Sequence, residues 1–212
     1  MKYIFDFDGT LVDSMPTWSG ALINALKKAG IPVPDGFVNT LTPLGNYKAS
    51  EYTISLGLDI TLKKYLDDLS KYLYREYTTN VRLKDNVKET LEELIRRGHS
   101  LSVLTASPHL YVDECLQNNG VFVLFEKVWT IDDFGHTKSE VIIYEEAAER
   151  LGTAVSDCVF VDDNLTALTT AKKSGMYTAA IYDDTSAQYM DEIKKVSDVY
   201  AVDFADILKF YS

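Results

Sequence analysis

The sequence predicts an α/β fold: a Rossmann-like parallel sheet core with helices on both faces, plus an inserted all-helical segment. From residue 84 onward, short apolar stretches alternate with stretches whose hydrophobic residues recur at helical spacing. This alternation is typical of parallel strands joined by helices. Near the start, about 70 residues of helical pattern (14–83) separate the first strand from the next, although a parallel crossover needs only about a dozen. An insertion is therefore expected there.

The first strand is expected at residues 2–7, where an apolar run ends in acidic residues. The inserted segment is expected to hold three helices, because its hydrophobic residues recur every three to four positions between Pro and Gly residues. The predicted bounds are 18–29, 48–56 and 62–77. We therefore divide the chain into an α/β core, 1–13 and 84–212, and a helical domain, 14–83.

The core then alternates helices with strands. Val87, Leu91 and Leu94 share one face of a helix, and Gly98 follows as a stop signal. The predicted core helices are 85–97, 108–118, 139–151, 164–174 and 204–210, with Asp203 as the N-cap of the last. The predicted core strands are 101–104, 127–130, 158–161, 177–181 and 199–202.

The acidic composition excludes several classes of partner. The chain has 21 Lys and Arg against 32 Asp and Glu, which gives a formal net charge of −11. Nucleic acids and anionic membrane surfaces bind through Lys and Arg, so we expect neither as a partner. No apolar run reaches the ~18 residues of a membrane span, and the N-terminus turns acidic before the apolar region of a signal peptide could form.

The two cysteines, Cys115 and Cys158, lie in unrelated segments without metal-ligand spacing. We expect both to be buried free thiols, as in a reducing compartment. We therefore expect a cytoplasmic protein. We also expect it to be a monomer or homodimer.

The most informative segment is Asp-Phe-Asp-Gly-Thr at residues 6–10, at the end of the first strand. Residues i and i+2 of a strand point to the same side, so Asp6 and Asp8 should face one site. Two adjacent carboxylates stay ionised only beside a cation; otherwise one keeps a proton. Either state suits a nucleophile next to a general acid and base. The alternative is a solvated Asp-Gly turn.

A second acidic pair, Asp162 and Asp163, ends the strand 158–161 in the same way. Asp163 could instead cap the helix that follows. Four carboxylates at one sheet edge would repel one another strongly without a cation. Oxygen ligands alone suit Mg²⁺, which also prefers a phosphate partner.

Phosphate also requires positive charge and hydrogen-bond donors. Lys138 is predicted at the start of a helix, where the helix dipole disfavours a cation, so a specific anionic partner is expected. A solvated surface lysine is the alternative. Thr105 ends the strand 101–104, just before a helix N-terminus that would attract an anion.

The order of these parts resembles the four-motif pattern of the haloacid dehalogenase-like hydrolase superfamily. The parts are the segment 6–10, Thr105, Lys138 and the pair 162–163. The resemblance covers essentially the whole chain. It is to the branch with a helical cap between the first two motifs, similar to β-phosphoglucomutases and phosphoglycolate phosphatases. It implies a phosphatase for a small phosphorylated metabolite, with Mg²⁺ as cofactor and 14–83 as the cap.

The resemblance also implies residue roles. Asp6 would be the nucleophile that becomes an aspartyl-phosphate, and Asp8 the general acid and base. Thr105 and Ala106 would bind phosphate, while Lys138 would stabilise the nucleophile and the transferring charge. The implied metal ligands are Asp6, the carbonyl of Asp8, Asp162 and Asp163. In the cap, Trp18 and Lys48 are the candidates for substrate selectivity.

Two departures from the family pattern narrow the function. Ser139 follows Lys138 where many relatives have Pro, and Trp18 stands where phosphohexomutases usually have His. Hydrolysis is therefore preferred, with a phosphohexomutase as the alternative. A non-enzymatic phosphoacceptor switch also combines acidic pairs, Thr and Lys, but in a different order and without a helical insert. A binding protein with a degenerate site is the third possibility.

Overall fold

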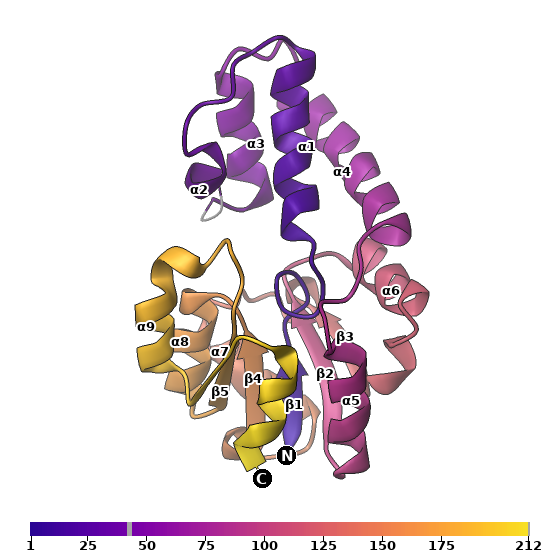
Figure 1. Cartoon of the computed structure of the whole chain (residues 1–212), viewed down its shortest axis with the longest axis vertical. Helices are drawn as coiled ribbons and strands as arrows, with labels where there is room; N and C mark the ends of the chain where they lie inside the picture. Colours follow the sequence, from indigo (N-terminus) through magenta and orange to yellow (C-terminus); the bar gives the residue numbers. More distant parts are fainter. Residues whose placement is uncertain (42–43, 212) are drawn as a thin grey trace. The chain divides into compact units, whose positions relative to one another are not determined.

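The computed structural model describes residues 1–41 and 44–211. Within these residues, six parallel strands form one sheet in the order β3-β2-β1-β4-β5-β6 (Figure 1). The strands are β1 (Lys2–Phe5), β2 (Ser100–Thr105), β3 (Lys127–Thr130), β4 (Cys158–Asp162), β5 (Tyr177–Ile181) and β6 (Val199–Ala201). The predicted α/β class with a parallel sheet is confirmed.

The strand order reverses direction between β1 and β4. Phe5 pairs with Val103 of β2 on one side and with Val161 of β4 on the other. The chain first builds outward from β1 to β3 and then returns to build β4, β5 and β6. Open α/β sheets bind their ligands at such a switch point, outside the carboxyl ends of the strands.

Helices cover both faces of this sheet. The helices of this part of the chain are α5 (Val87–Arg96), α6 (His109–Asn118), α7 (Val141–Arg150), α8 (Leu165–Ser174) and α9 (Met190–Val196). Ile4 and Phe160 point to one face and pack in a buried cluster with residues of α7 and α8. Phe5 points to the other face, where its ring stacks on Phe204 with centroids 5.9 Å apart. Alternate strand residues therefore supply two apolar layers.

Several elements differ from their predicted bounds for local reasons. Helix α5 begins at Val87 rather than at residue 85, because Asn86 has a left-handed backbone with φ 62°. Strand β1 ends at Phe5, because the carbonyl of Phe7 accepts hydrogen bonds from Leu11 and Val12 as the chain turns. The last helix, Phe204–Tyr211, is a 3₁₀ helix. The short helices α2 (Phe37–Leu41) and α9 were not predicted.

The chain divides into two compact units, Met1–Asp13 with Arg82–Ser212, and Ser14–Val81. The second connection lies two residues before the predicted position of 83/84. Backbone hydrogen bonds explain the difference, because Asp13 donates to the carbonyl of Arg82 and Lys84 donates to that of Leu11. Leu83 also forms an antiparallel bridge with Val12. These pairings attach the residues after Val81 to the α/β unit.

The second unit is helical within its described residues. Its helices are α1 (Met15–Lys28), α2, α3 (Gly45–Ser55) and α4 (Leu62–Thr79). On α4 the buried residues recur every four positions at Tyr65, Leu69, Leu73 and Tyr77, which is one helical face. Leu22 and Leu26 of α1 are also buried, and helix α4 packs against both α1 and α3. These side chains form a core of their own for the unit.

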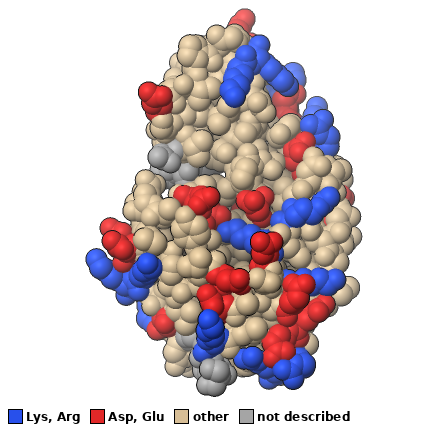
Figure 2. Space-filling model, in the orientation of Figure 1, with Lys and Arg blue, Asp and Glu red and all other residues tan. Residues whose placement is uncertain are grey.

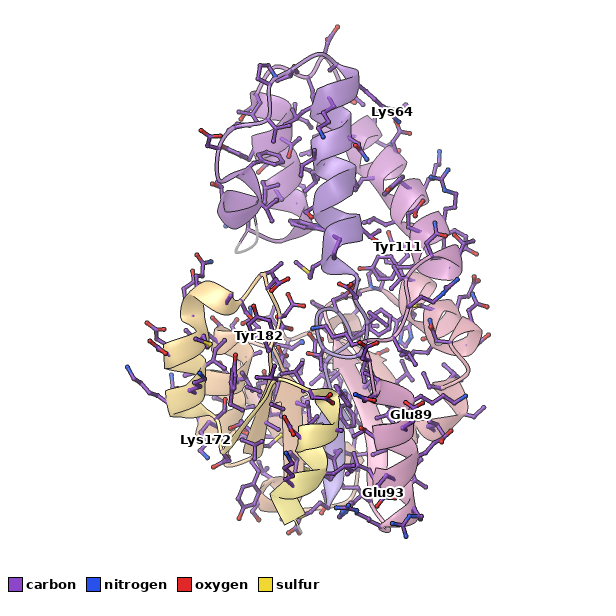
Figure 3. All side chains as sticks on the ribbon, viewed as in Figure 1. Lys64, Glu89, Glu93, Tyr111, Lys172 and Tyr182 are labelled. Carbon is purple, nitrogen blue, oxygen red and sulfur yellow. The ribbon has the colours of Figure 1, made fainter. Side chains whose placement is uncertain are left out.

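Lys, Arg, Asp and Glu side chains are intermixed on one face of the α/β unit (Figure 2). On the face shown in Figure 2, acidic and basic side chains alternate over the α/β unit. Many are paired: Lys172 of α8, labelled in Figure 3, contacts Asp198 just before β6. Within residues 1–41 and 44–211, no helix is both long and apolar enough to cross a membrane. Both cysteines are buried and free, as expected.

Candidate active site

Three carboxylates meet at the switch point of the sheet. Asp6 follows β1 directly, Asp162 is the last residue of β4, and Asp163 is the next residue. One oxygen from each of the three lies within 4.8 Å of the others, and all three residues are buried. The Asp6 amide donates to the carbonyl of Val161 at 2.8 Å, which joins the ends of β1 and β4. Residues 156 positions apart in the sequence are therefore neighbours here.

Lys138 reaches into this cluster from the loop before α7. Its Nζ lies 2.5 Å from Oδ1 of Asp6 and 2.8 Å from Oδ2 of Asp162. The other oxygen of Asp162 accepts a hydrogen bond from the amide of Asn164 at 2.7 Å. Lys138 was predicted at a helix start, but α7 begins only at Val141. The lysine instead occupies a turn, which frees it from the unfavourable end of a helix dipole.

Burial, and after it the neighbouring negative charges, shift the pKa values of the carboxylates in this cluster. Burial is the largest cause that raises the pKa of Asp6 to about 7; the charges of Asp162 and Asp8 add to it, and Lys138 opposes it. Burial likewise raises the pKa of Asp163 well above its ordinary value, with Asp162 and Asp6 adding to it. Burial alone would lower the pKa of Lys138, but the adjacent carboxylates raise it overall. One lysine therefore does not neutralise the cluster.

The donor set fits a hard divalent cation. With all groups ionised, the three carboxylates and one ammonium carry a net charge of −3 + 1 = −2. The raised pKa values of Asp6 and Asp163 show that the carboxylates resist full ionisation without added positive charge. Oxygen donors alone are the ligands that Mg²⁺ prefers. Asp6, Asp162 and Asp163 are the side chains that could hold such an ion.

Gly9 allows Asp163 to approach the turn after β1. Its φ is +75°, and a Cβ built on it would lie 2.9 Å from Oδ1 of Asp163. Thr10 donates from its hydroxyl to the same oxygen at 3.3 Å. Glycine is therefore required at position 9 both for the backbone conformation and for the contact with the carboxylate.

We expect Gly9→Ala to destabilise the protein more than Gly152→Ala. Gly152 has φ +64° with nothing within 4 Å of a built Cβ, so its substitution carries only the backbone strain, about 1–2 kcal/mol. The clash with Asp163 should add about 1 kcal/mol or more at Gly9. Urea denaturation of both variants measures the difference. Equal losses of unfolding free energy would contradict the close approach.

Asp8 is directed to a different partner from Asp6. Its Oδ2 accepts a short hydrogen bond from the hydroxyl of Ser107. The amide of Ser107 donates in turn to Oγ1 of Thr105 at 3.0 Å, which closes a small loop after β2. Thr105 is buried at the end of β2, and Ala106 is exposed beside it. The loop 105–107 thus lies against the turn that carries Asp8.

A second ion pair near the cluster was missed by the sequence analysis. Lys84 Nζ lies 2.8 Å from Oδ2 of Asp183, and donates to the carbonyl of Tyr182, labelled in Figure 3, at 3.1 Å. Asp183 raises and Lys84 lowers the pKa of Asp163. A signal was present, because Asp183 and Asp184 follow β5 much as Asp162 and Asp163 end β4.

A cavity of about 480 Å³ opens in the α/β unit beside this ion pair, and its walls include Lys84, Asp183 and Phe204.

The two candidates for substrate selectivity, Trp18 and Lys48, belong to the helical unit. Trp18 is half-buried on α1, and Lys48 is exposed on α3.

Comparisons with known proteins agree with this geometry. Residues 3–181 match the haloacid dehalogenase-like hydrolase family. Phosphoglycolate phosphatase of Vibrio parahaemolyticus is 30% identical over 179 residues, covering 81% of this chain and 78% of that protein. A crystal structure from Haemophilus somnus 129pt, described as a predicted phosphoglycolate phosphatase, superposes with a TM-score of 0.83 at 26% identity, covering 99% of this chain and 97% of that one.

A candidate β-phosphoglucomutase from Thermotoga maritima shares the fold, with a TM-score of 0.81 at 19% identity and coverage of 100% of this chain and 99% of that one. The family match spans β1 to β5 and so contains every charged residue of the cluster. A carboxylate cluster with its lysine at the switch point, within a matched stretch of this length, leads to one conclusion: the chain is an enzyme of the haloacid dehalogenase-like hydrolase family.

Proposed function

We propose that this protein is a Mg²⁺-dependent phosphatase that hydrolyses a small phosphorylated metabolite through an aspartyl-phosphate. The observation that carries the proposal is the pairing of Lys138 with Asp6 inside a buried cluster of three carboxylates. The similarity to phosphoglycolate phosphatases supports the same reaction class. A buried carboxylate fixed beside an ammonium is suited to attack phosphorus and to tolerate the charge of a phosphoryl group.

Asp6 is the proposed nucleophile. Its carboxylate oxygen bonds to phosphorus while the bond from phosphorus to the leaving oxygen breaks, and Asp8 gives that oxygen a proton. Water then gives a proton to Asp8 and attacks phosphorus. The bond between phosphorus and the Asp6 oxygen breaks, which releases inorganic phosphate and restores both aspartates. Lys138 holds the Asp6 oxygen in place and offsets the negative charge.

Mg²⁺ is the proposed cofactor, held by Asp6, Asp162, Asp163 and the carbonyl of Asp8. When bound, it would neutralise phosphate oxygens and the carboxylates that receive them. Thr105 and the backbone at Ala106 are proposed to bind the phosphate, because Thr105 ends β2 beside β1 and both residues precede the N-terminus of α6.

The helical unit, Ser14–Val81, is proposed to serve as the cap of the α/β unit. Trp18 and Lys48 are proposed to contribute to substrate choice from this cap. Two alternatives remain to be tested, a phosphohexomutase and a phosphoacceptor that does not turn over. The resemblance to a candidate β-phosphoglucomutase concerns the fold, and Trp18 in place of His favours hydrolysis over mutase chemistry.

A phosphatase screen tests the proposal directly. Purified protein is given sugar phosphates, nucleotides, phosphoglycolate and p-nitrophenyl phosphate, with Mg²⁺ or with EDTA, and released phosphate is measured. We expect Mg²⁺-dependent release from at least one small phosphate ester. Conversion between sugar phosphate isomers without release would indicate the mutase. A stable phosphoprotein after acetyl phosphate treatment, without turnover, would indicate the phosphoacceptor.

A further inference from the structure

Lys138 lies in an exposed turn and yet must be held against buried carboxylates. Its neighbours Thr137 and Ser139 are both exposed. The turn closes on itself, because the amide of Thr137 donates to the Glu140 carboxylate at 2.8 Å and the amide of Glu140 donates to the carbonyl of Thr137 at 3.0 Å. These bonds shape the turn, but they do not attach it to the sheet.

Tyr144 provides that attachment from the first turn of α7. Its side chain is fully buried, and its Oη lies 2.8 Å from the carbonyl oxygen of Lys138. The same Oη lies 3.1 Å from the carbonyl oxygen of Ala167, in the first turn of α8. One hydroxyl proton is therefore shared between two carbonyls. The backbone of Lys138 is thereby linked to the helix that follows Asp162 and Asp163.

Ring contacts with Phe160 also connect Tyr144 and Lys138 to the sheet. The Tyr144 ring packs edge-on against Phe160 of β4, with centroids 5.0 Å apart and an interplanar angle of 77°. Nζ of Lys138 lies 5.6 Å from the centroid of the same Phe160 ring. Phe160 pairs in register with Ile4 of β1, two residues before Asp6. Tyr144 and Phe160 thus connect the lysine to both strands that carry the carboxylates.

We propose that Tyr144 is a positioning residue for Lys138, and that its hydroxyl holds the lysine backbone at the distance from β4 that its two ion pairs require. The inference rests on the proposed function, because Lys138 has its proposed catalytic role only there. The two ammonium contacts, of 2.5 and 2.8 Å, lie at or below the short end of the usual hydrogen-bond range of about 2.7–3.2 Å, so a displacement of ~1 Å would take both beyond it. A shift of the turn by ~1 Å would therefore misplace the ammonium.

Tyr144→Phe tests this role, because it keeps the ring in the core and removes only the hydroxyl. We expect kcat to fall about tenfold, with KM changed by less than about twofold, since the lysine would be misplaced while substrate binding is kept. Tyr65→Phe is the matched control: Tyr65 is also buried, but it belongs to the helical unit. The kcat of the Tyr65→Phe enzyme should match that of the wild type.

A double-mutant cycle separates positioning from general stability. In a Lys138→Met background, adding Tyr144→Phe should change the residual rate by less than about twofold, because the hydroxyl would act only through the lysine. Full additivity of the two substitutions would overturn the proposal. So would a Tyr144→Phe enzyme as fast as the wild type.

A spectroscopic measurement decides the question independently of turnover. In protein labelled with ¹⁵N-lysine, the Lys138 ammonium signal is identified by its loss in Lys138→Met. We expect this signal to be sharp in the wild type and broadened or lost in Tyr144→Phe. An unchanged signal would overturn the proposal even if no phosphate ester is hydrolysed. Absence of phosphatase activity in the wild type would instead contradict the proposed function alone.

Discussion

Asp6→Asn should reduce phosphate release from p-nitrophenyl phosphate by at least about 1,000-fold. The amide has nearly the same shape as the carboxylate, but it cannot form the aspartyl-phosphate. The variant should stay folded, because it removes one of three mutually repelling carboxylates while Asp162 still pairs with Lys138. The measurement is the initial rate with Mg²⁺ present, with circular dichroism to confirm the fold.

Asp132→Asn provides the matched control. Asp132 is an exposed carboxylate in the turn after β3, outside the cluster, and its substitution should leave the rate unchanged. A folded Asp6→Asn enzyme that keeps wild-type turnover would refute the nucleophile and, with it, the proposed mechanism. Acid-quench labelling adds a direct readout: a phosphorylated intermediate should be trapped on the wild type and not on Asp6→Asn.

Removal of Mg²⁺ should abolish turnover and destabilise the protein in a pH-dependent manner. The pKa of Asp6 is raised to about 7 in the folded protein and returns to its ordinary value of 3.8 when the chain unfolds. A carboxyl group with a raised pKa contributes stability that is complete below pH 3.8 and is lost as the pH rises through about 7. The metal-free protein should therefore lose stability across this window, and added Mg²⁺ should restore it.

The stabilising effect of Mg²⁺ should accordingly grow from pH 5 to pH 7, as Asp6 loses its proton. Mg²⁺ binding displaces the proton from a protonated carboxyl group. For each proton displaced, the apparent affinity for Mg²⁺ therefore rises about tenfold per pH unit below the pKa of that group. Unfolding temperatures measured with and without Mg²⁺ at each pH isolate this effect. Subtracting the unfolding temperature without Mg²⁺ from the one with Mg²⁺ cancels the contribution of groups that titrate equally in both samples. His109 is such a group: its hydrogen bond to Asp113 raises its pKa.

Asp163→Asn should lose most of this Mg²⁺ response, while Asp132→Asn should keep it, because only Asp163 belongs to the cluster. A Mg²⁺ effect that is independent of pH between 5 and 8 would contradict metal binding by protonated carboxyl groups. Full activity in EDTA would contradict the metal requirement itself.

The acidic residues of the cluster could be expected together from the sequence because their signals are local. Asp6, Asp162 and Thr105 each lie where an apolar run ends, and the ends of parallel strands meet at one edge of a sheet. Strand periodicity was therefore enough to expect Asp6 and Asp162 close together, and the structure confirms it. The predicted position of Lys138 at a helix start was wrong, since the turn 137–140 delays α7.

Other contacts could not be predicted, because they join common residue types from distant segments. Ser107 meets Asp8 across 99 positions, and Tyr144 meets Ala167 across 23. Neither Ser nor Tyr carries a distinctive spacing, so the packing of loops and helices alone selects these partners. The same holds for Lys84, whose ion pair with Asp183 depends on how the connection after the helical unit returns to the sheet.

The sequence by itself determined the α/β class, the helical insertion, the strand-end acids and the family resemblance, because these depend on periodicity and on motif order along the chain. Only the tertiary structure decided which carboxylate oxygens face one another, how far burial raises the pKa of Asp6, and which hydroxyls support Asp8 and Lys138. Those properties depend on distance and burial, which arise only when segments far apart in the chain pack together.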